Sequence, residues 1–115
     1  MTPDLKFSVI IPVHNRAREI SRAVRSVLSQ EYPLFEIIVV DDGSTDDTAA
    51  AVKAFTDKRV RYIYQENRER GAARNAGTNA ATGDFVTFLD SDDEFLPGHL
   101  AAARNCISNK PGFDV

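Results

Sequence analysis

Hydrophobic residues along the chain alternate between short continuous runs and stretches with helical spacing. The continuous runs predict strands at 7–11, 36–40, 60–64 and 85–89, of which 60–64 is the most polar. Helices are expected after each of them, at 15–28, 44–55, 71–81 and from Pro97 onward. Strands that alternate with helices are typical of βαβ units. The pattern therefore predicts an α/β fold, in which one parallel sheet carries helices on both faces.

Turn and capping residues mark the expected ends of these elements. Pro12 is expected to end the first strand, because a proline cannot donate a hydrogen bond to a sheet ladder. Asn15 is interpreted as the N-cap of the helix that follows. Residues 44–47 (Ser-Thr-Asp-Asp) have the form of a capping box for the next helix. Small residues fill 71–81, which would let that helix approach a ligand or a neighbouring strand closely.

Composition narrows the classes of protein to consider. A chain of 115 residues is long enough for one domain with one hydrophobic core. The formal net charge of -3 and the absence of a Lys/Arg cluster argue against a nucleic-acid partner. A single cysteine, Cys106, excludes an internal disulfide and fits a reducing compartment.

The sequence also bears on where the protein is located and on whether the chain is part of a longer one. No apolar run approaches the roughly 18 residues that a membrane span requires, and no signal peptide is evident. We therefore expect a cytoplasmic location, with membrane attachment at the inner face left open for a full-length protein. Residues 113–115 (Phe-Asp-Val) resemble a fifth strand that does not develop, so we expect the amino-terminal part of a longer chain. An unfinished sheet edge would favour self-association.

Polar residues gather directly after three of the expected strands. They form the segments 12–15 (Pro-Val-His-Asn), 41–44 (Asp-Asp-Gly-Ser) and 90–93 (Asp-Ser-Asp-Asp). Ligands of open α/β sheets bind in the crevice at the carboxyl ends of the strands. The sequence therefore predicts one site that draws on all three segments.

Asp90 and Asp92 are the candidate metal ligands. Two carboxylates so close together repel each other, and a divalent cation removes that repulsion. Mg²⁺ and Mn²⁺ prefer oxygen ligands, and Mg²⁺ is usually held by one or two carboxylates together with waters and phosphates. The alternative is a solvated turn, or a cap for the helix near Pro97. The position after an apolar strand and beside a second acidic strand end favours the cation.

The other candidates also have simpler explanations. Asp41, Asp42 and Gly43 could form only a turn between a strand and a helix. An acid at this edge could instead accept a hydrogen bond from the imide N–H of uracil or thymine. Arg74 and Asn75 lie on the small-residue helix, where an arginine is either solvated or a partner for a diphosphate.

Four segments of the chain, each common on its own, form a distinctive set when they occur in this order. They are 7–15 (Phe-Ser-Val-Ile-Ile-Pro-Val-His-Asn), 37–46 (Ile-Ile-Val-Val-Asp-Asp-Gly-Ser-Thr-Asp), 71–77 (Gly-Ala-Ala-Arg-Asn-Ala-Gly) and 83–93 (Gly-Asp-Phe-Val-Thr-Phe-Leu-Asp-Ser-Asp-Asp). In this order they resemble the family 2 glycosyltransferases of the GT-A fold, over nearly the whole chain. His14 departs from that family, which often has an aromatic residue such as Tyr at this position.

The resemblance implies a Rossmann-like three-layer α/β/α sandwich with strand order 3-2-1-4 that binds a nucleotide sugar. In that family, the acid at the position of Asp42 contacts uracil, and the one at Asp92 ligates Mn²⁺ or Mg²⁺ together with Asp90. The implied nucleotide-binding residues are Pro12, Val13, His14, Asn15, Asp41, Asp42, Gly43, Arg74, Asn75, Asp90 and Ser91.

The resemblance also implies a reaction. A sugar passes from a donor, here expected to be a UDP-sugar, to an acceptor hydroxyl, usually with inversion. The metal stabilises the departing nucleoside diphosphate, and a general base deprotonates the acceptor. In that family the acceptor-binding region and the base come later in the chain, beyond the position of Val115. Residues 1–115 are therefore expected to bind the nucleotide sugar without transferring it.

Two other interpretations stay open at this point. A phosphoacceptor signalling domain also gathers aspartates and Mg²⁺ at a sheet edge, but it carries an acid pair after its first strand, where this chain has Pro12. The second is a non-catalytic nucleotide-binding module, which the missing base makes a serious alternative. The donor sugar, the acceptor and the oligomeric state do not follow from these residues.

Overall fold

The computed structural model describes residues 5–66 and 70–108, which contain one sheet of four parallel strands. The strands are β1 (Phe7–Val13), β2 (Phe35–Asp42), β3 (Val60–Gln65) and β4 (Phe85–Phe88). Their order is β3-β2-β1-β4, so the expected order 3-2-1-4 is confirmed. The fifth strand expected at 113–115 lies outside the described residues.

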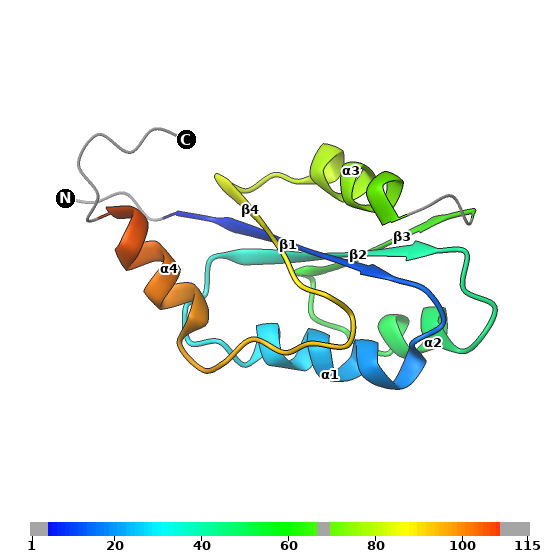
Figure 1. Ribbon diagram of the computed structural model, residues 1–115. Coiled ribbons are helices and arrows are strands. Elements are labelled where there is room, and N and C mark those ends of the chain that lie inside the picture. The colour runs from blue at the N-terminus through cyan, green and yellow to red at the C-terminus, as the bar shows by residue number, and fades with distance from the viewer. Residues whose placement is uncertain (1–4, 67–69, 109–115) are drawn as a thin grey trace.

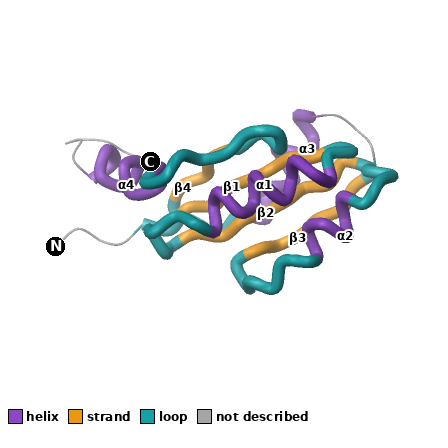
Figure 2. The backbone as a smooth tube through the Cα atoms, turned by 90° about the horizontal axis from the view of Figure 1, so that it is seen from below, coloured by secondary structure: helices purple, strands orange, loops and turns teal. Residues whose placement is uncertain are grey.

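Helices cover both faces of the sheet, as the sequence predicts. α1 (Ala17–Leu28) and α2 (Thr48–Lys53) lie on one face, and α3 (Arg70–Ala80) lies on the other (Figure 1). Viewed from below, α1 runs along β1 and β2, while α2 lies nearer β3 (Figure 2). α4 (His99–Ser108) follows a long loop after β4 and lies near the amino end of β1. The arrangement is a three-layer α/β/α sandwich.

The hydrophobic core has two parts because the central strands are covered on both faces. Side chains on a strand alternate between its faces, so Val9 and Ile11 join the larger cluster with α1 and α2, whereas Ile10 joins the smaller one under α3. The smaller cluster consists of Ile10, Ile38, Val40 and Ala73. All eight residues of β2 are buried, which explains its nearly continuous apolar sequence.

Gly77 allows α3 to lie close to β1. A Cβ atom at this position would stand 2.5 Å from Cγ2 of Ile10, which is itself fully buried. Real side chains do not approach that closely, so either the helix or Ile10 would have to shift. The small residues of α3 therefore serve close packing on the strand, one of the two roles predicted for them.

Replacing Gly77 with alanine is expected to destabilise the fold by about 1–3 kcal/mol through overpacking. Alanine normally favours a helix by up to about 1 kcal/mol over glycine, so the sign of the change tests the packing explanation. Urea denaturation measures it, with Asn79→Ala on the exposed side of α3 as the control. A Gly77→Ala protein as stable as wild type would contradict the close approach.

A buried carboxylate joins three strands near the amino end of the sheet. Glu36 on β2 accepts hydrogen bonds from Oγ of Ser8 on β1 (2.6 Å) and from Nη1 of Arg61 on β3 (2.8 Å). It also accepts from the backbone N–H (2.6 Å) and Oγ1 (2.9 Å) of Thr82, just before β4. Burial alone raises the pKa of Glu36, but the hydrogen bonds from Ser8, Thr82 and Arg61 outweigh burial and lower it to about 2.

Pro12 does not end the first strand, and that prediction is wrong. β1 continues to Val13, and Pro12 pairs with Val40 on β2. In a parallel strand, residues two apart direct their backbone groups to the same side. The carbonyl of Ile10 accepts the N–H of Leu89 (3.0 Å), so the nitrogen of Pro12 faces the side from which β4 has already departed. The missing N–H therefore breaks no ladder bond.

Asn15 is not the N-cap of α1. The cap is Arg16, and its side chain makes no capping hydrogen bond. Asn15 instead has a φ of 50°, in the left-handed region that asparagine tolerates better than most residues. Its Oδ1 accepts hydrogen bonds from the backbone N–H groups of Thr45 (2.8 Å) and Asp46 (3.3 Å). The residue ties two neighbouring loops together.

The capping box predicted at 44–47 is also absent. α2 begins at Thr48, and its N-cap, Asp47, makes no side-chain capping bond. Asp46 accepts hydrogen bonds from the N–H (3.0 Å) and Oγ1 (2.5 Å) of Thr48. The polar residues therefore organise the loop before the helix rather than its first turn.

Candidate functional site

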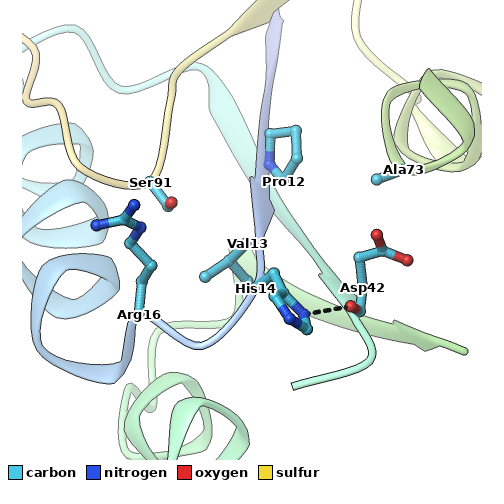
Figure 3. A pocket seen from close by; sticks show the side chains of 7 residues that line it. All are labelled: Pro12, Val13, His14, Arg16, Asp42, Ala73 and Ser91. Carbon is cyan, nitrogen blue, oxygen red and sulfur yellow. Dashed lines mark hydrogen bonds between the residues drawn. The ribbon is translucent and has the colours of Figure 1, made fainter. Parts of the chain in front are cut away.

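A cleft of about 280 Å³ opens at the carboxyl ends of β1 and β2 (Figure 3). It is lined by Pro12, Val13, His14, Arg16, Asp42, Ala73 and Ser91. A second hollow of about 140 Å³ is lined by Pro12, Arg16, Asp90, Ser91 and Asp92. The two hollows share Pro12, Arg16 and Ser91, so they lie side by side, and we refer to the pair as the groove. The structure thus brings together the three polar segments that the sequence predicts to meet.

Asp42 supplies the carboxylate of the larger hollow. Figure 3 shows its carboxylate directed toward Ala73, and the residue is only 8% exposed. Its Oδ1 accepts a hydrogen bond from Nε2 of Gln65 at the end of β3 (3.0 Å). This contact orients an acid inside a cleft that is large enough for part of a ligand.

His14 is fixed by the same residue. Its Nδ1 lies 2.7 Å from the carbonyl oxygen of Asp42. A carbonyl oxygen can only accept, so Nδ1 carries the proton in this contact. Nε2 lies 3.3 Å from Nδ2 of Asn15, which can donate to it. The imidazole therefore forms part of the wall of the cleft, and its hydrogen bond to Asp42 holds it there.

Asp41 points away from the groove, unlike its neighbour. It is 1% exposed, and it accepts hydrogen bonds from the Tyr62 hydroxyl (2.6 Å) and the Ser44 N–H (2.9 Å). Burial, with the Asp41 carboxylate beside it, raises the pKa of Tyr62. Gly43 follows with a φ of 75°, as the turn requires. Asp41 and Gly43 therefore shape the loop, and the part that the sequence predicts for them in nucleotide binding stays a prediction.

Three carboxylates stand at the other end of the groove. Asp90, Asp92 and Asp93 each have a carboxylate oxygen within 4.8 Å of the others, and all three residues are exposed. Asp93 was not among the ligands predicted from the sequence. Hard oxygen ligands at this spacing suit Mg²⁺ or Mn²⁺. The donor set therefore fits the metal that the sequence predicts.

Arg74 borders this acidic triad from α3. Its Nη2 lies 3.8 Å from Oδ1 of Asp90, and its guanidinium lies over the ring of Phe88, with Cζ 5.4 Å from the ring centre. Its buried Nε has no hydrogen-bond partner among the described residues. Asn75 is exposed on α3 and lines neither hollow. Arg74 and Asn75, which the sequence predicts as one nucleotide-binding pair, thus differ: Arg74 lies beside the triad and Asn75 lies outside both hollows.

Two polar side chains, Ser26 on α1 and Gln30 just after it, hold the segment that follows the triad. The Gln30 amide, just after the helix, donates to the carbonyl of Leu96 (2.9 Å) and accepts from the N–H of Leu100 (3.1 Å). Oγ of Ser26 accepts the N–H of Phe95 (3.0 Å). These contacts hold the chain just after the triad against the end of α1.

Sequence reasoning missed Arg16, which lines both hollows. Figure 3 shows its guanidinium beside Ser91, on the α1 side of the cleft. Its place directly after the segment 12–15 was the available signal.

Comparison with known proteins decides the family. The model of glycosyl transferase family 2 matches residues 8–110. This chain belongs to that family. An uncharacterised glycosyltransferase of Rickettsia felis is 48% identical over 93 residues, which are 80% of this chain and 15% of the relative. The phosphoacceptor interpretation is therefore dropped, and the predicted family is confirmed.

Solved structures support the same fold. TarS of S. aureus, crystallised with UDP, has a TM-score of 0.85 and 32% identity, over 96% of this chain and 38% of that one. The mannosyltransferase PcManGT from Pyrobaculum calidifontis, in complex with GDP-Man and Mn²⁺, has a TM-score of 0.77 and 30% identity, over 96% and 34% of the two chains. This chain thus covers only a minor part of the length of these relatives. None of its described helices is long and apolar enough to cross a membrane.

Proposed function

We propose that this chain is the donor-binding part of a glycosyltransferase and that it binds a nucleotide sugar, with UDP as the nucleotide. The observation that carries the proposal is the single groove, which has the Asp42 carboxylate at one end and the acidic triad at the other. A nucleoside diphosphate has a matching order, with a hydrogen-bonding base at one end and a diphosphate that binds cations at the other. Relatives bound to UDP and to GDP-Man support the class of ligand.

The metal end of the groove is proposed to hold Mn²⁺ or Mg²⁺. Asp90 and Asp92 both line the smaller hollow, and Asp93 completes the set of oxygens. A bound cation supplies charge that stabilises the departing nucleoside diphosphate. The residues of this chain hold the cation and orient the donor above β1. The Mn²⁺ in the mannosyltransferase relative supports this assignment.

Calorimetry with UDP tests the proposed function. Affinity is expected to be at least about tenfold higher with Mn²⁺ than without metal, because the bare diphosphate would meet three carboxylates at close range. Equal affinities would contradict the metal site. The absence of UDP and GDP binding under both conditions would contradict the proposed function as a whole.

Asp42 is proposed to accept the imide N–H of uracil, which would favour UDP over GDP. Replacing Asp42 with asparagine is then expected to weaken UDP binding about tenfold to a hundredfold, since a charged hydrogen bond contributes about 1.5–3 kcal/mol. The affinity for GDP is expected to fall less, because the N–H groups of a purine lie at other positions than the imide N–H of uracil. Calorimetry with both nucleotides measures the difference, and Asp47→Asn on the exposed loop is the control. Equal losses would show that Asp42 acts through charge or folding instead.

We further propose that the complete protein transfers the sugar to an acceptor hydroxyl with inversion, and that residues 1–115 alone do not. An acceptor needs a base within about 3 Å of its proton and a site that positions it. The described acids of the groove are already assigned to binding uracil or the metal, so none is left to act as the general base. A coupled assay for release of UDP, with a panel of saccharide and lipid acceptors, is expected to show no transfer above the Asp92→Ala protein. Acceptor-dependent transfer above that control would contradict the proposal.

A further inference from the structure

Arg16 occupies the junction of the two hollows. Both are lined by Pro12, Arg16 and Ser91, whereas Asp42 belongs only to the larger and Asp92 only to the smaller. A ligand that reaches from Asp42 to the triad therefore passes the residues that the two hollows share, and Arg16 is the only charged one among them. For a nucleoside diphosphate with its base at Asp42, the part that crosses the junction is the sugar-to-phosphate region.

The backbone of Arg16 is fixed while its side chain projects from the surface. Its N–H donates to Oγ1 of the buried Thr48 (3.2 Å), and its carbonyl accepts the N–H of Ile20 (2.8 Å). Asn15, at a φ of 50°, turns the chain just before it. The Arg16 side chain makes no hydrogen bond or ion pair with the residues that the structure describes. It is therefore available to a ligand at no cost in existing contacts.

The charges around the groove favour a contact between Arg16 and a diphosphate. Asp42, Asp90, Asp92 and Asp93 make the groove acidic, and the nearest opposing cation on α3, Arg74, already lies beside Asp90 and over a ring. A diphosphate carries several negative charges, of which a single divalent cation offsets only part. An arginine presents paired donors that match phosphate oxygens. Arg16 stands on the α1 side of the groove, opposite α3 (Figure 3).

Resting on the proposed function, we infer that Arg16 binds the diphosphate of the nucleotide donor and so selects nucleoside diphosphates over nucleosides. It shares the diphosphate with the cation at the triad, from the opposite side of the junction. The contact would hold the leaving group in place, and it makes Arg16 a specificity-determining residue of the donor site.

Calorimetry with UDP in the presence of Mn²⁺ tests this inference, with a nuclear magnetic resonance titration for the weaker ligand uridine. Arg16→Ala is expected to weaken UDP binding about tenfold to a hundredfold, the range of a charged hydrogen bond, and to leave uridine binding unchanged. Arg16→Lys is expected to lie between wild type and Arg16→Ala, because lysine keeps the charge but loses the paired donors. Arg18→Ala, an exposed arginine in the first turn of α1, is the matched control and is expected to match wild type.

Each result decides a different point. If Arg16→Ala and Arg18→Ala bind UDP equally well, the inference is wrong while the proposed function stands. If uridine weakens as much as UDP, Arg16 acts on the base or on folding, and the diphosphate assignment is wrong. A loss seen with UDP-GlcNAc but not with UDP would place Arg16 at the sugar and would also overturn it. If the wild-type protein binds neither UDP nor GDP, the proposed function itself fails.

Discussion

Replacing Asp92 with alanine is expected to remove the Mn²⁺-dependent part of UDP binding, with a loss of affinity above about a hundredfold. Changes to residues that only orient a metal ligand already cost about tenfold to a hundredfold in metal affinity, so the loss of a ligand is expected to cost more. The exposed Asp92 contributes no packing to either hydrophobic cluster. The free energy of unfolding is therefore expected to stay within about 0.5 kcal/mol of wild type.

Calorimetry with and without Mn²⁺ measures this effect, and urea denaturation confirms that the variant is folded. Glu31→Ala is the matched control, because Glu31 is an exposed acid beyond the far end of α1 from the groove. The two variants remove the same charge from the protein. If both weaken UDP binding equally, the effect comes from net charge, and Asp92 is not a metal ligand.

The largest loss of stability is expected from Glu36→Ala, at about 3–5 kcal/mol. Removing the buried Glu36 carboxylate leaves the Ser8 hydroxyl proton and the Thr82 N–H without their acceptor, and each such loss costs about 1–3 kcal/mol. The half-exposed Arg61 loses its ion pair but keeps a hydrogen bond to the carbonyl of Ala80. Natural domains are stable by only about 5–15 kcal/mol, so this change removes a large part of the total. Asp57→Ala is the control, because it breaks a 2.9 Å ion pair with Arg59 at the surface. That loss is expected to stay at or below about 1 kcal/mol.

The same carboxylate predicts how stability depends on pH. The folded state holds the pKa of Glu36 at about 2, below its ordinary value of 4.5. The stabilisation is therefore fully present above about pH 4.5 and is lost as the pH falls from there toward 2. Asp57 shifts in the same direction, so the wild-type curve alone does not isolate Glu36. Urea denaturation between pH 2 and 6 is expected to give a flatter curve for Glu36→Gln than for wild type, and parallel curves would contradict this account.

The strands and the meeting of three polar segments could be predicted because hydrophobic runs and strand ends are local signals. Asp42, Asp90 and Asp92 lie in the groove for the same reason: each follows, or ends, a strand that the pattern identifies. The family resemblance added the order of the strands, which periodicity alone does not determine.

The errors have a common physical cause, since they depend on contacts between segments distant in the sequence. Asn15 looks like a cap, yet its side chain bonds to Thr45 and Asp46, some 30 residues away. Asp41 and Asp42 are neighbours on β2 and therefore face opposite sides of the sheet, but only the fold shows that Asp41 meets Tyr62 and that Asp42 lines the cleft. The part of Asp41 in nucleotide binding stays a prediction. Arg16 is one of several arginines along α1, and only the fold shows that it faces the groove.

Pro12 lies where the pairing of β1 with β4 ends and the groove begins. The last ladder bond between β1 and β4 joins the carbonyl of Ile10 to the N–H of Leu89, and a further one would need a donor at residue 12. Proline has none, so the ladder between the two strands lacks its next hydrogen bond, and the chain that carries the triad leaves the sheet beyond Leu89. The ligand site is thus an interruption in β-sheet pairing that a single imino acid keeps open.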